Sequence, residues 1–171
     1  MIRHPVTAAP PGLCYGRTDP GLGPDALGQI ERAVALLEGC MAIVTSPLPR
    51  CMALAEALAA ANGAALRTDP RLAEIDFGAW EGRLWDAISR TESDPWAADP
   101  WSVAPPGGET FADVHARVGA ALADVVAGAV VVTHAGVIRA ARMIVEGATF
   151  GDVFAEPVPY AEPMRLGRKA A

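Results

Sequence analysis

The sequence predicts an α/β fold: a three-layer α/β/α sandwich with a mainly parallel central sheet. Segments with apolar residues at helical spacing alternate along the chain with short runs of β-branched residues. One such run, residues 129–132, reads Ala-Val-Val-Val, which is typical of a parallel strand buried on both faces. No internal repeat and no linker divides the chain, so we expect a single domain over residues 1–171.

The individual elements follow from local signals. Pro49 stands near the first position of a helix that Asn62-Gly63 ends, and Thr110 with Asp113 forms a capping pair at the start of another. The prolines of the tail allow at most a short edge strand near residues 164–166. The expected helices cover residues 24–39, 49–62, 85–101 in one or two short pieces, 110–125 and 137–145, and the expected strands cover residues 41–45, 65–68 and 129–132.

Composition narrows the possible functions. The chain carries 14 Lys and Arg against 20 Asp and Glu, a formal net charge of −6. An acidic surface of this size argues against nucleic acid or an anionic membrane as the main partner. Three cysteines without a C-x-x-C pair predict reduced thiols, and we find neither a signal peptide nor a run of apolar residues long enough to span a membrane. We therefore expect a cytoplasmic protein.

Two histidines follow apolar runs of β type. His4 follows Met1-Ile2-Arg3, and His134 follows the run that ends at Thr133. Strand ends are where α/β folds place their reactive groups, so both imidazoles are expected in one pocket. A guanidinium beside an imidazole is useful where an anion must be held and attacked, and Arg50, near the start of the helix after residue 45, is a second cation of this kind. The pattern predicts phosphate chemistry.

In this scheme a neutral imidazole attacks phosphorus, and the arginines lower the pKa of the histidine so that its lone pair is free. The acid that protonates the leaving oxygen is a carboxyl group near Leu72 and Phe77. Glu74 is the candidate and Asp76 the competitor, since alternation places both on one side of an extended chain. The spacing of the histidines is not that of a metal site, so neither a metal nor a cofactor is expected. His115, at the edge of an apolar helix stripe, is expected to be structural.

These residues lie in motifs that closely resemble those of the histidine phosphatase (phosphoglycerate-mutase-like) superfamily. The matches are Arg3-His4, Gly12-x-Cys14-Tyr15-Gly16-Arg17-x-Asp19, Ser46-Pro47-Leu48-x-Arg50, Leu72-x-Glu74-x-x-Phe77-Gly78-x-Trp80-Glu81-Gly82, Gly108-Glu109-Thr110 and His134-x-Gly136. The resemblance implies a metal-independent phosphatase with a phosphohistidine intermediate. It implies His4 as the nucleophile, Arg3, Arg50 and His134 as the phosphate pocket, and Glu74 rather than Asp76 as the proton donor.

Within the superfamily, the loop from Gly12 to Asp19 looks most like that of the α-ribazole phosphatases of cobalamin biosynthesis, and Tyr15 and Arg17 are candidate substrate-binding residues. The Ser/Thr-x-Trp-Asn run of the mutases is missing, which favours water as the phosphoryl acceptor. The expected partner is a small phosphorylated metabolite, and a homodimer is one option. The alternatives are a broad-specificity phosphatase, a phosphoglycerate-mutase-like enzyme, and a non-catalytic binder of phosphorylated ligands.

The chain departs from the family at two points. Pro5 replaces the usual glycine and removes a backbone N–H, for which the hydroxyl of Thr7 is the expected substitute as a phosphate donor. The first strand, expected to be central, has only Met1 and Ile2 before Arg3. Either residues that precede it are missing or the strand is short, and a short strand predicts a poorly held nucleophile.

Overall fold

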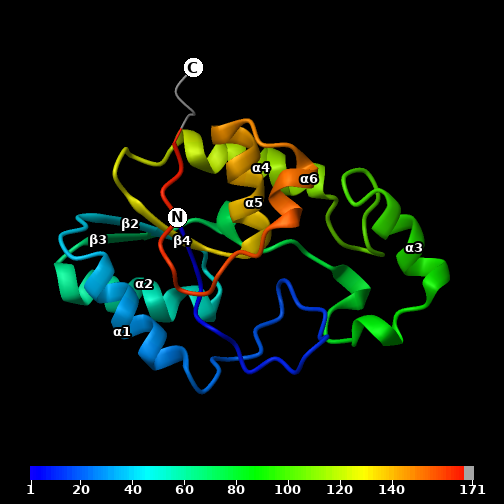
Figure 1. Ribbon diagram of the computed structural model, residues 1–171, viewed down its shortest axis with the longest axis horizontal. Coiled ribbons are helices and arrows are strands. Elements are labelled where there is room, and N and C mark those ends of the chain that lie inside the picture. Colours follow the sequence, from blue (N-terminus) through cyan, green and yellow to red (C-terminus); the bar gives the residue numbers. More distant parts are fainter. Residues whose placement is uncertain (168–171) are drawn as a thin grey trace.

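The computed structural model describes residues 1–167 and confirms the predicted fold class. A parallel four-stranded sheet has the order β1-β4-β2-β3, and helices cover both of its faces (Figure 1). The strands are β1 (Ile2–Arg3), β2 (Ala42–Thr45), β3 (Ala65–Thr68) and β4 (Val130–Thr133). Their boundaries agree with the apolar runs of the sequence to within about one residue.

The helices also follow the predicted pattern, with one addition. They are α1 (Ala26–Leu36), α2 (Pro49–Asn62), α3 (Arg90–Ala98), α4 (Phe111–Ala123), α5 (Ala135–Glu146) and α6 (Phe150–Ala155), with 3₁₀ turns at Pro70–Leu72, Gly78–Trp80 and Trp85–Ala87. The sequence analysis missed α6. Its signal is a capping box in which Thr149 and Asp152 exchange hydrogen bonds, the same device that begins α4.

Alternating side chains of the strands divide the core into two layers. Ile43 and Val132 pack with α1 and α2 below the sheet in Figure 1, whereas Val44 and Val131 pack with α4 and α5 above it. Successive residues of a strand point to opposite faces, so a run of apolar residues supplies both layers. No helix within residues 1–167 is long and apolar enough to cross a membrane.

The prediction of a central first strand is wrong, because β1 stands at the end of the strand order. It is short, but backbone hydrogen bonds flank it on both sides. Arg3 pairs with Thr133 of β4, and the residue after the strand donates its N–H to the Thr133 carbonyl at 2.9 Å. On the other side, the Ala161 N–H donates to the Arg3 carbonyl at 3.0 Å and the Met164 N–H to Met1 at 2.7 Å. The returning chain therefore supports the strand along its outer edge.

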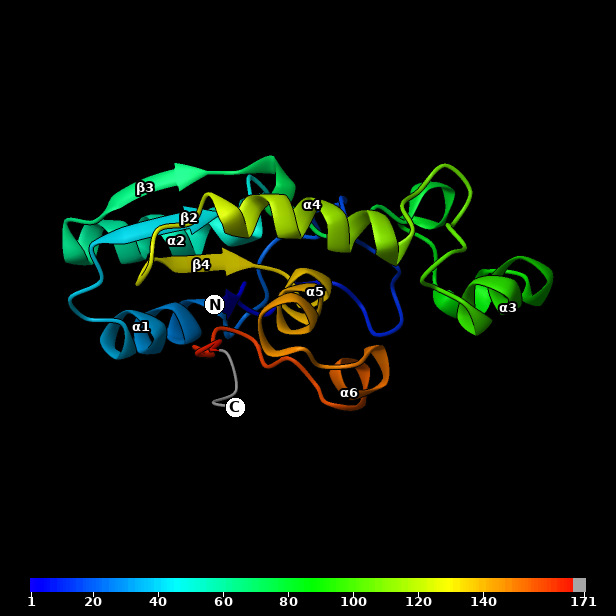
Figure 2. The same cartoon turned by 90° about the horizontal axis from the view of Figure 1, so that it is seen from above.

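The carboxyl ends of β1, β4 and β2 lie next to one another, since these strands are parallel neighbours. The residues that follow them directly are His4, His134 and Ser46. Both views show α3 beyond these strand ends and away from the sheet (Figures 1 and 2). The topology thus gathers polar side chains at the edge of a parallel sheet where ligands usually bind.

Candidate active site

His4 lies directly after β1 and is 2% exposed. Its Nδ1 is 2.7 Å from the carbonyl oxygen of Pro5, and because a carbonyl can only accept, Nδ1 carries the proton. The neutral imidazole then has its lone pair on Nε2. Pro5 has lost the backbone N–H of a glycine, but it keeps the carbonyl that selects the tautomer and orients the ring of His4.

His134 lies behind His4, with the centroids of the two rings 5.2 Å apart. It stands at the N-cap position of α5, where its side chain makes no capping hydrogen bond, and is completely buried. Its Nε2 is 2.7 Å from the hydroxyl of Ser46 and 3.4 Å from the sulfur of Cys51. Sequence reasoning gave Ser46 a place in a family motif but no role in the site. The structure shows that its side chain fixes one nitrogen of His134.

Both imidazoles are held neutral by their surroundings. Burial, more than any other cause, lowers the pKa of His4 from 6.5 to about 3, the Pro5 carbonyl opposes this change, and Arg50 and Arg3 add to it. Burial likewise lowers the pKa of His134 well below 6.5, with the positive charges nearby as lesser causes. The arginines act in the predicted direction, but removal from water is the larger effect. The lone pair of His4 is therefore available for attack on phosphorus.

These pKa values predict acid-sensitive stability. In the unfolded chain both histidines bind a proton near pH 6.5, whereas in the folded protein His4 does so only near pH 3. The stability that each contributes is fully present above pH 6.5. As the pH is lowered below 6.5, the free energy of unfolding decreases by up to about 1.4 kcal/mol per pH unit for each group. We expect urea unfolding between pH 6.5 and 5 to show this fall, and a His4→Gln variant to show a shallower slope. An equal slope in both proteins would contradict it.

Arg50, predicted near the start of α2, is its second residue and is 1% exposed. Its two terminal nitrogens donate to the carbonyl oxygens of Gly16 and Thr18 and to the carboxylate of Asp19, the last at 2.9 Å. The Nε of Arg50 is buried and has no partner within residues 1–167. The loop at residues 16–19 thus holds the two terminal nitrogens of the guanidinium, whereas Nε keeps an unused N–H donor.

Arg3 is anchored from the tail of the chain. Its Nη1 donates to the carbonyl of Val158 at 2.7 Å, and its guanidinium lies 3.7 Å above the ring of Tyr160, which also lies 5.6 Å from the ring of His4. Among the described residues its buried Nε has no partner either. Sequence reasoning missed Tyr160, because nothing near it in the chain indicates that it folds back under the first strand.

The side chains at these strand ends enclose a cavity of about 290 Å³. Four of the five predicted catalytic residues, Arg3, His4, Arg50 and Glu74, line it, together with Leu13, Tyr15, Phe77, Trp85 and Arg139. Three arginines, the imidazole of His4 and the carboxyl group of Glu74 thus line one space. A cavity with these side chains suits a phosphate dianion, since each guanidinium can donate hydrogen bonds to the phosphate oxygens and offset the phosphate charge.

Of the other predicted substrate-binding residues, Thr7, Tyr15 and Arg17, only Tyr15 is among those that line the cavity. Tyr15 lines the cavity, and its hydroxyl lies 3.0 Å from that of Thr7, a buried residue that is not among those lining the cavity. Arg17 is also outside the lining, and its guanidinium pairs with Glu109 at 3.2 Å. A contact between phosphate and the Thr7 hydroxyl stays a prediction, as does substrate binding by Arg17.

Glu74 approaches the first turn of α5. One carboxyl oxygen accepts a hydrogen bond from the N–H of Gly136 at 3.2 Å, and the other from the N–H of Ile75 at 3.0 Å. A Cβ at position 136 would collide with Oε1 of Glu74, the oxygen that accepts from Ile75. Only glycine leaves room for this approach, which gives the His134-x-Gly136 motif a physical reason.

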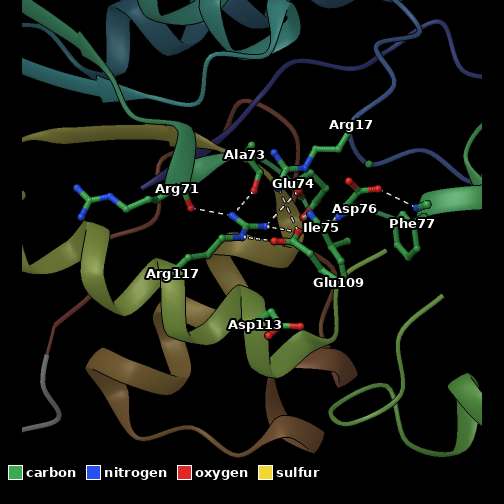
Figure 3. A network of polar contacts seen from close by, with 12 residues as sticks. Arg17, Arg71, Ala73, Glu74, Ile75, Asp76, Phe77, Glu109, Asp113 and Arg117 are labelled. Carbon is green, nitrogen blue, oxygen red and sulfur yellow. Dashed lines mark hydrogen bonds and ion pairs between the residues drawn. The ribbon is translucent and has the colours of Figure 1, made fainter. Parts of the chain in front are cut away.

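The backbone around Glu74 is held by Arg117 of α4 (Figure 3). Arg117 donates to the carbonyl oxygens of Arg71, Ala73 and Glu74 at 2.7, 2.6 and 3.2 Å, and it pairs with Glu109 at 2.9 Å. Sequence reasoning assigned Arg117 no role, because the three carbonyl groups to which it donates are more than 40 residues away in the chain. This network fixes the position from which the Glu74 side chain enters the cavity.

The expectation that Glu74 and Asp76 share one side of an extended chain is wrong. The segment forms no strand, and Glu109 binds the N–H of Asp76 at 2.9 Å. The carboxylate of Asp76 accepts from the N–H of Gly78 at 2.8 Å and is outside the cavity lining. The structure therefore separates the two carboxylates, and Glu74 is the one that faces His4 across the cavity.

His115 belongs to α4, its ring centroid lies 5.4 Å from that of Trp101, and it is not among the residues that line the cavity. Its structural role stays a prediction. Cys14, Cys40 and Cys51 are free thiols. Within residues 1–167 no group of three or more histidine, cysteine, aspartate or glutamate side chains is placed to hold a metal ion.

Comparison with known proteins identifies the family to which the chain belongs. The model of the histidine phosphatase superfamily (branch 1) matches residues 1–169. The bifunctional protein Rv2228c of Mycobacterium tuberculosis is 38% identical over 127 residues, which are 69% of this chain and 34% of that protein. The chain thus spans about a third of the length of the first curated relatives that it matches.

Two solved structures share the fold. YhfR of Bacillus stearothermophilus superposes with a TM-score of 0.82 at 27% identity, covering 93% of this chain and 84% of its own. A mycobacterial glucosyl-3-phosphoglycerate phosphatase superposes with a TM-score of 0.76 at 28% identity, covering 90% and 81%. With the motifs, the sheet and the paired histidines in agreement, this chain belongs to the histidine phosphatase superfamily.

Proposed function

We propose that this chain is a phosphomonoesterase that transfers a phosphoryl group first to His4 and then to water. The observation that carries the proposal is the shared cavity, in which the free Nε2 of His4, two anchored guanidinium groups and the carboxyl group of Glu74 face one another. This set supplies a nucleophile, a phosphate-binding site and a proton donor in one place.

In the first step, Nε2 of His4 attacks phosphorus while the bond from phosphorus to the ester oxygen breaks. The protonated carboxyl group of Glu74 gives its proton to that oxygen, so an alcohol leaves and a carboxylate remains. Arg3 and Arg50 offset the charge of the three other phosphate oxygens. His134 is fully buried and does not line the cavity, but its ring centroid lies 5.2 Å from that of His4 and its Nε2 contacts the Ser46 hydroxyl. Its proposed role is to donate a hydrogen bond to the same group.

In the second step, water attacks the phosphohistidine from the side that the alcohol has left. Glu74 takes a proton from this water, the bond from phosphorus to Nε2 breaks, and inorganic phosphate forms. The electron pair returns to His4 as the neutral imidazole, which burial favours. Each residue then has the protonation state with which it began.

The favoured substrate is α-ribazole 5′-phosphate. The loop motif from Gly12 to Asp19 supports this assignment, and Tyr15 of that loop lines the cavity. The missing mutase motif and the phosphatase name of one structural neighbour support water as the acceptor. A broad-specificity phosphatase with the same chemistry is the second candidate, since the cavity walls beside Tyr15 are mainly Leu13, Phe77 and Trp85.

The test is turnover by the purified chain. We expect release of phosphate from p-nitrophenyl phosphate, unchanged by EDTA, and a higher kcat/KM for α-ribazole 5′-phosphate than for other phosphorylated metabolites in a panel. Equal values across the panel would favour the broad-specificity enzyme. Activity that EDTA abolishes would overturn the mechanism. Calorimetric binding of phosphate without turnover of any ester would leave only a phospho-ligand binder.

A further inference from the structure

A second cavity, of about 370 Å³, adjoins the first. It lies among the side chains of α3, the segment that follows it, the start of α4, and α6. Phe111, Phe150 and Phe154 line it with their rings in contact, their centroids 4.4 to 5.4 Å apart, and Trp96 and Pro100 close the side toward α3. Its volume is in the range of roughly 300–1,000 Å³ that small-molecule sites occupy.

Three residues line both cavities: Glu74, Phe77 and Arg139. The two spaces therefore meet at the proposed proton donor. Glu74 must lie next to the ester oxygen to protonate it, so the carbon atoms of the leaving alcohol start beside Glu74. The apolar cavity shares Glu74 with the first cavity and is the space that adjoins it there. Because Glu74 lines both cavities, the apolar cavity is the one next to the leaving alcohol rather than to the phosphate.

The lining offers little to a charged alcohol. Glu74 and Arg139 are its only ionisable side chains among the described residues. Of these, Arg139 donates through Nε to the carbonyl of Val153 at 3.0 Å, and its guanidinium lies 4.7 Å above the ring of Phe154. The remaining lining side chains are apolar or aromatic. An alkyl or aryl body gains from burial there, whereas a carboxylate loses water and meets few polar groups in return.

We propose that this cavity is the specificity site of the enzyme and that it binds the apolar body of the leaving alcohol. The inference rests on the proposed phosphatase function. It assigns the chain to phosphomonoesters whose alcohol continues within a few bonds into an alkyl chain or an aromatic ring system. Phosphorylated acids such as 3-phosphoglycerate fall outside this class.

A series of alkyl phosphates tests the proposal, because lengthening the chain from ethyl through butyl to hexyl hardly changes the acidity of the leaving alcohol. Burial of each added CH₂ is expected to raise kcat/KM by about 2- to 4-fold, and hence by at least about tenfold from ethyl to hexyl. A flat series with measurable turnover, or a preference for 3-phosphoglycerate over hexyl phosphate, would overturn this inference while the proposed function stands. No turnover of any ester would mean instead that the proposed function fails.

A matched pair of variants locates the effect. Ala97 and Ala98 are both exposed residues of α3, and of the two only Ala97 lines the apolar cavity. An Ala97→Trp substitution fills the space and is expected to reduce the hexyl-to-ethyl ratio of kcat/KM at least fivefold, by an order-of-magnitude argument from lost burial. The Ala98→Trp control is expected to keep the wild-type ratio. An equal change in both variants, or none in Ala97→Trp, would place the preference elsewhere.

Discussion

Replacing His4 with glutamine is expected to abolish turnover of every phosphomonoester. Glutamine has a similar volume and can fill the buried position, but its amide nitrogen has no lone pair for attack on phosphorus. The loss in kcat should be roughly 10⁴- to 10⁶-fold, as for other enzymes that lose a nucleophile. Steady-state kinetics with p-nitrophenyl phosphate measures it. Rapid quenching of the wild type with labelled substrate should also trap a phosphoenzyme that is stable in base and labile in acid, and the variant should give none.

His115→Gln is the matched control for this substitution. His115, the one histidine of the chain outside the proposed site, packs beside Trp101 and does not line the cavity. Its replacement is therefore expected to keep both turnover and the trapped phosphoenzyme. Circular dichroism at a pH above 6.5 checks that both variants fold. A folded His4→Gln variant with wild-type activity, or a phosphoenzyme that survives in it, would exclude His4 as the nucleophile.

A Glu74→Gln variant is expected to lose activity in a way that depends on the leaving group. The amide keeps the shape of the side chain but has no acidic proton. For hexyl phosphate, whose alkoxide is a poor leaving group, kcat/KM should fall by about 10²- to 10⁴-fold. For p-nitrophenyl phosphate the loss should be much smaller, because nitrophenolate leaves without a proton. The measurement is the ratio of kcat/KM for the two esters, compared between variant and wild type.

Asp76→Asn provides the comparison for this variant, since Asp76 is two residues away and is the competing candidate from the sequence. Its carboxylate accepts from the N–H of Gly78, so its replacement should affect stability more than the ratio. Finding the leaving-group dependence in Asp76→Asn instead of Glu74→Gln would reverse the assignment of the acid. A uniform loss on both esters in Glu74→Gln would mean that this residue binds phosphate rather than donating a proton.

Local signals were sufficient for most of the secondary structure. The capping pair at Thr110 and Asp113 begins α4 as predicted, and Gly63 ends α2 in a left-handed conformation, because caps depend on hydrogen bonds between residues a few positions apart. The same reasoning would have found α6 from Thr149 and Asp152. This helix was missed because the prolines that follow it, at positions 157, 159 and 163, favour an extended tail.

By itself, the sequence determined the fold class, the order of the elements and the pair of residues Arg3 and His4 at a strand end, since each depends on neighbours along the chain. The tertiary structure alone decided which distant groups complete the site. It turned Glu74 into the cavity and Asp76 away from it through Glu109 and Arg117, and it brought Tyr160 under Arg3. It also supported the short β1 from the returning chain at residues 161–164. These contacts join residues 33 to 163 positions apart, and local periodicity carries no information about such pairs.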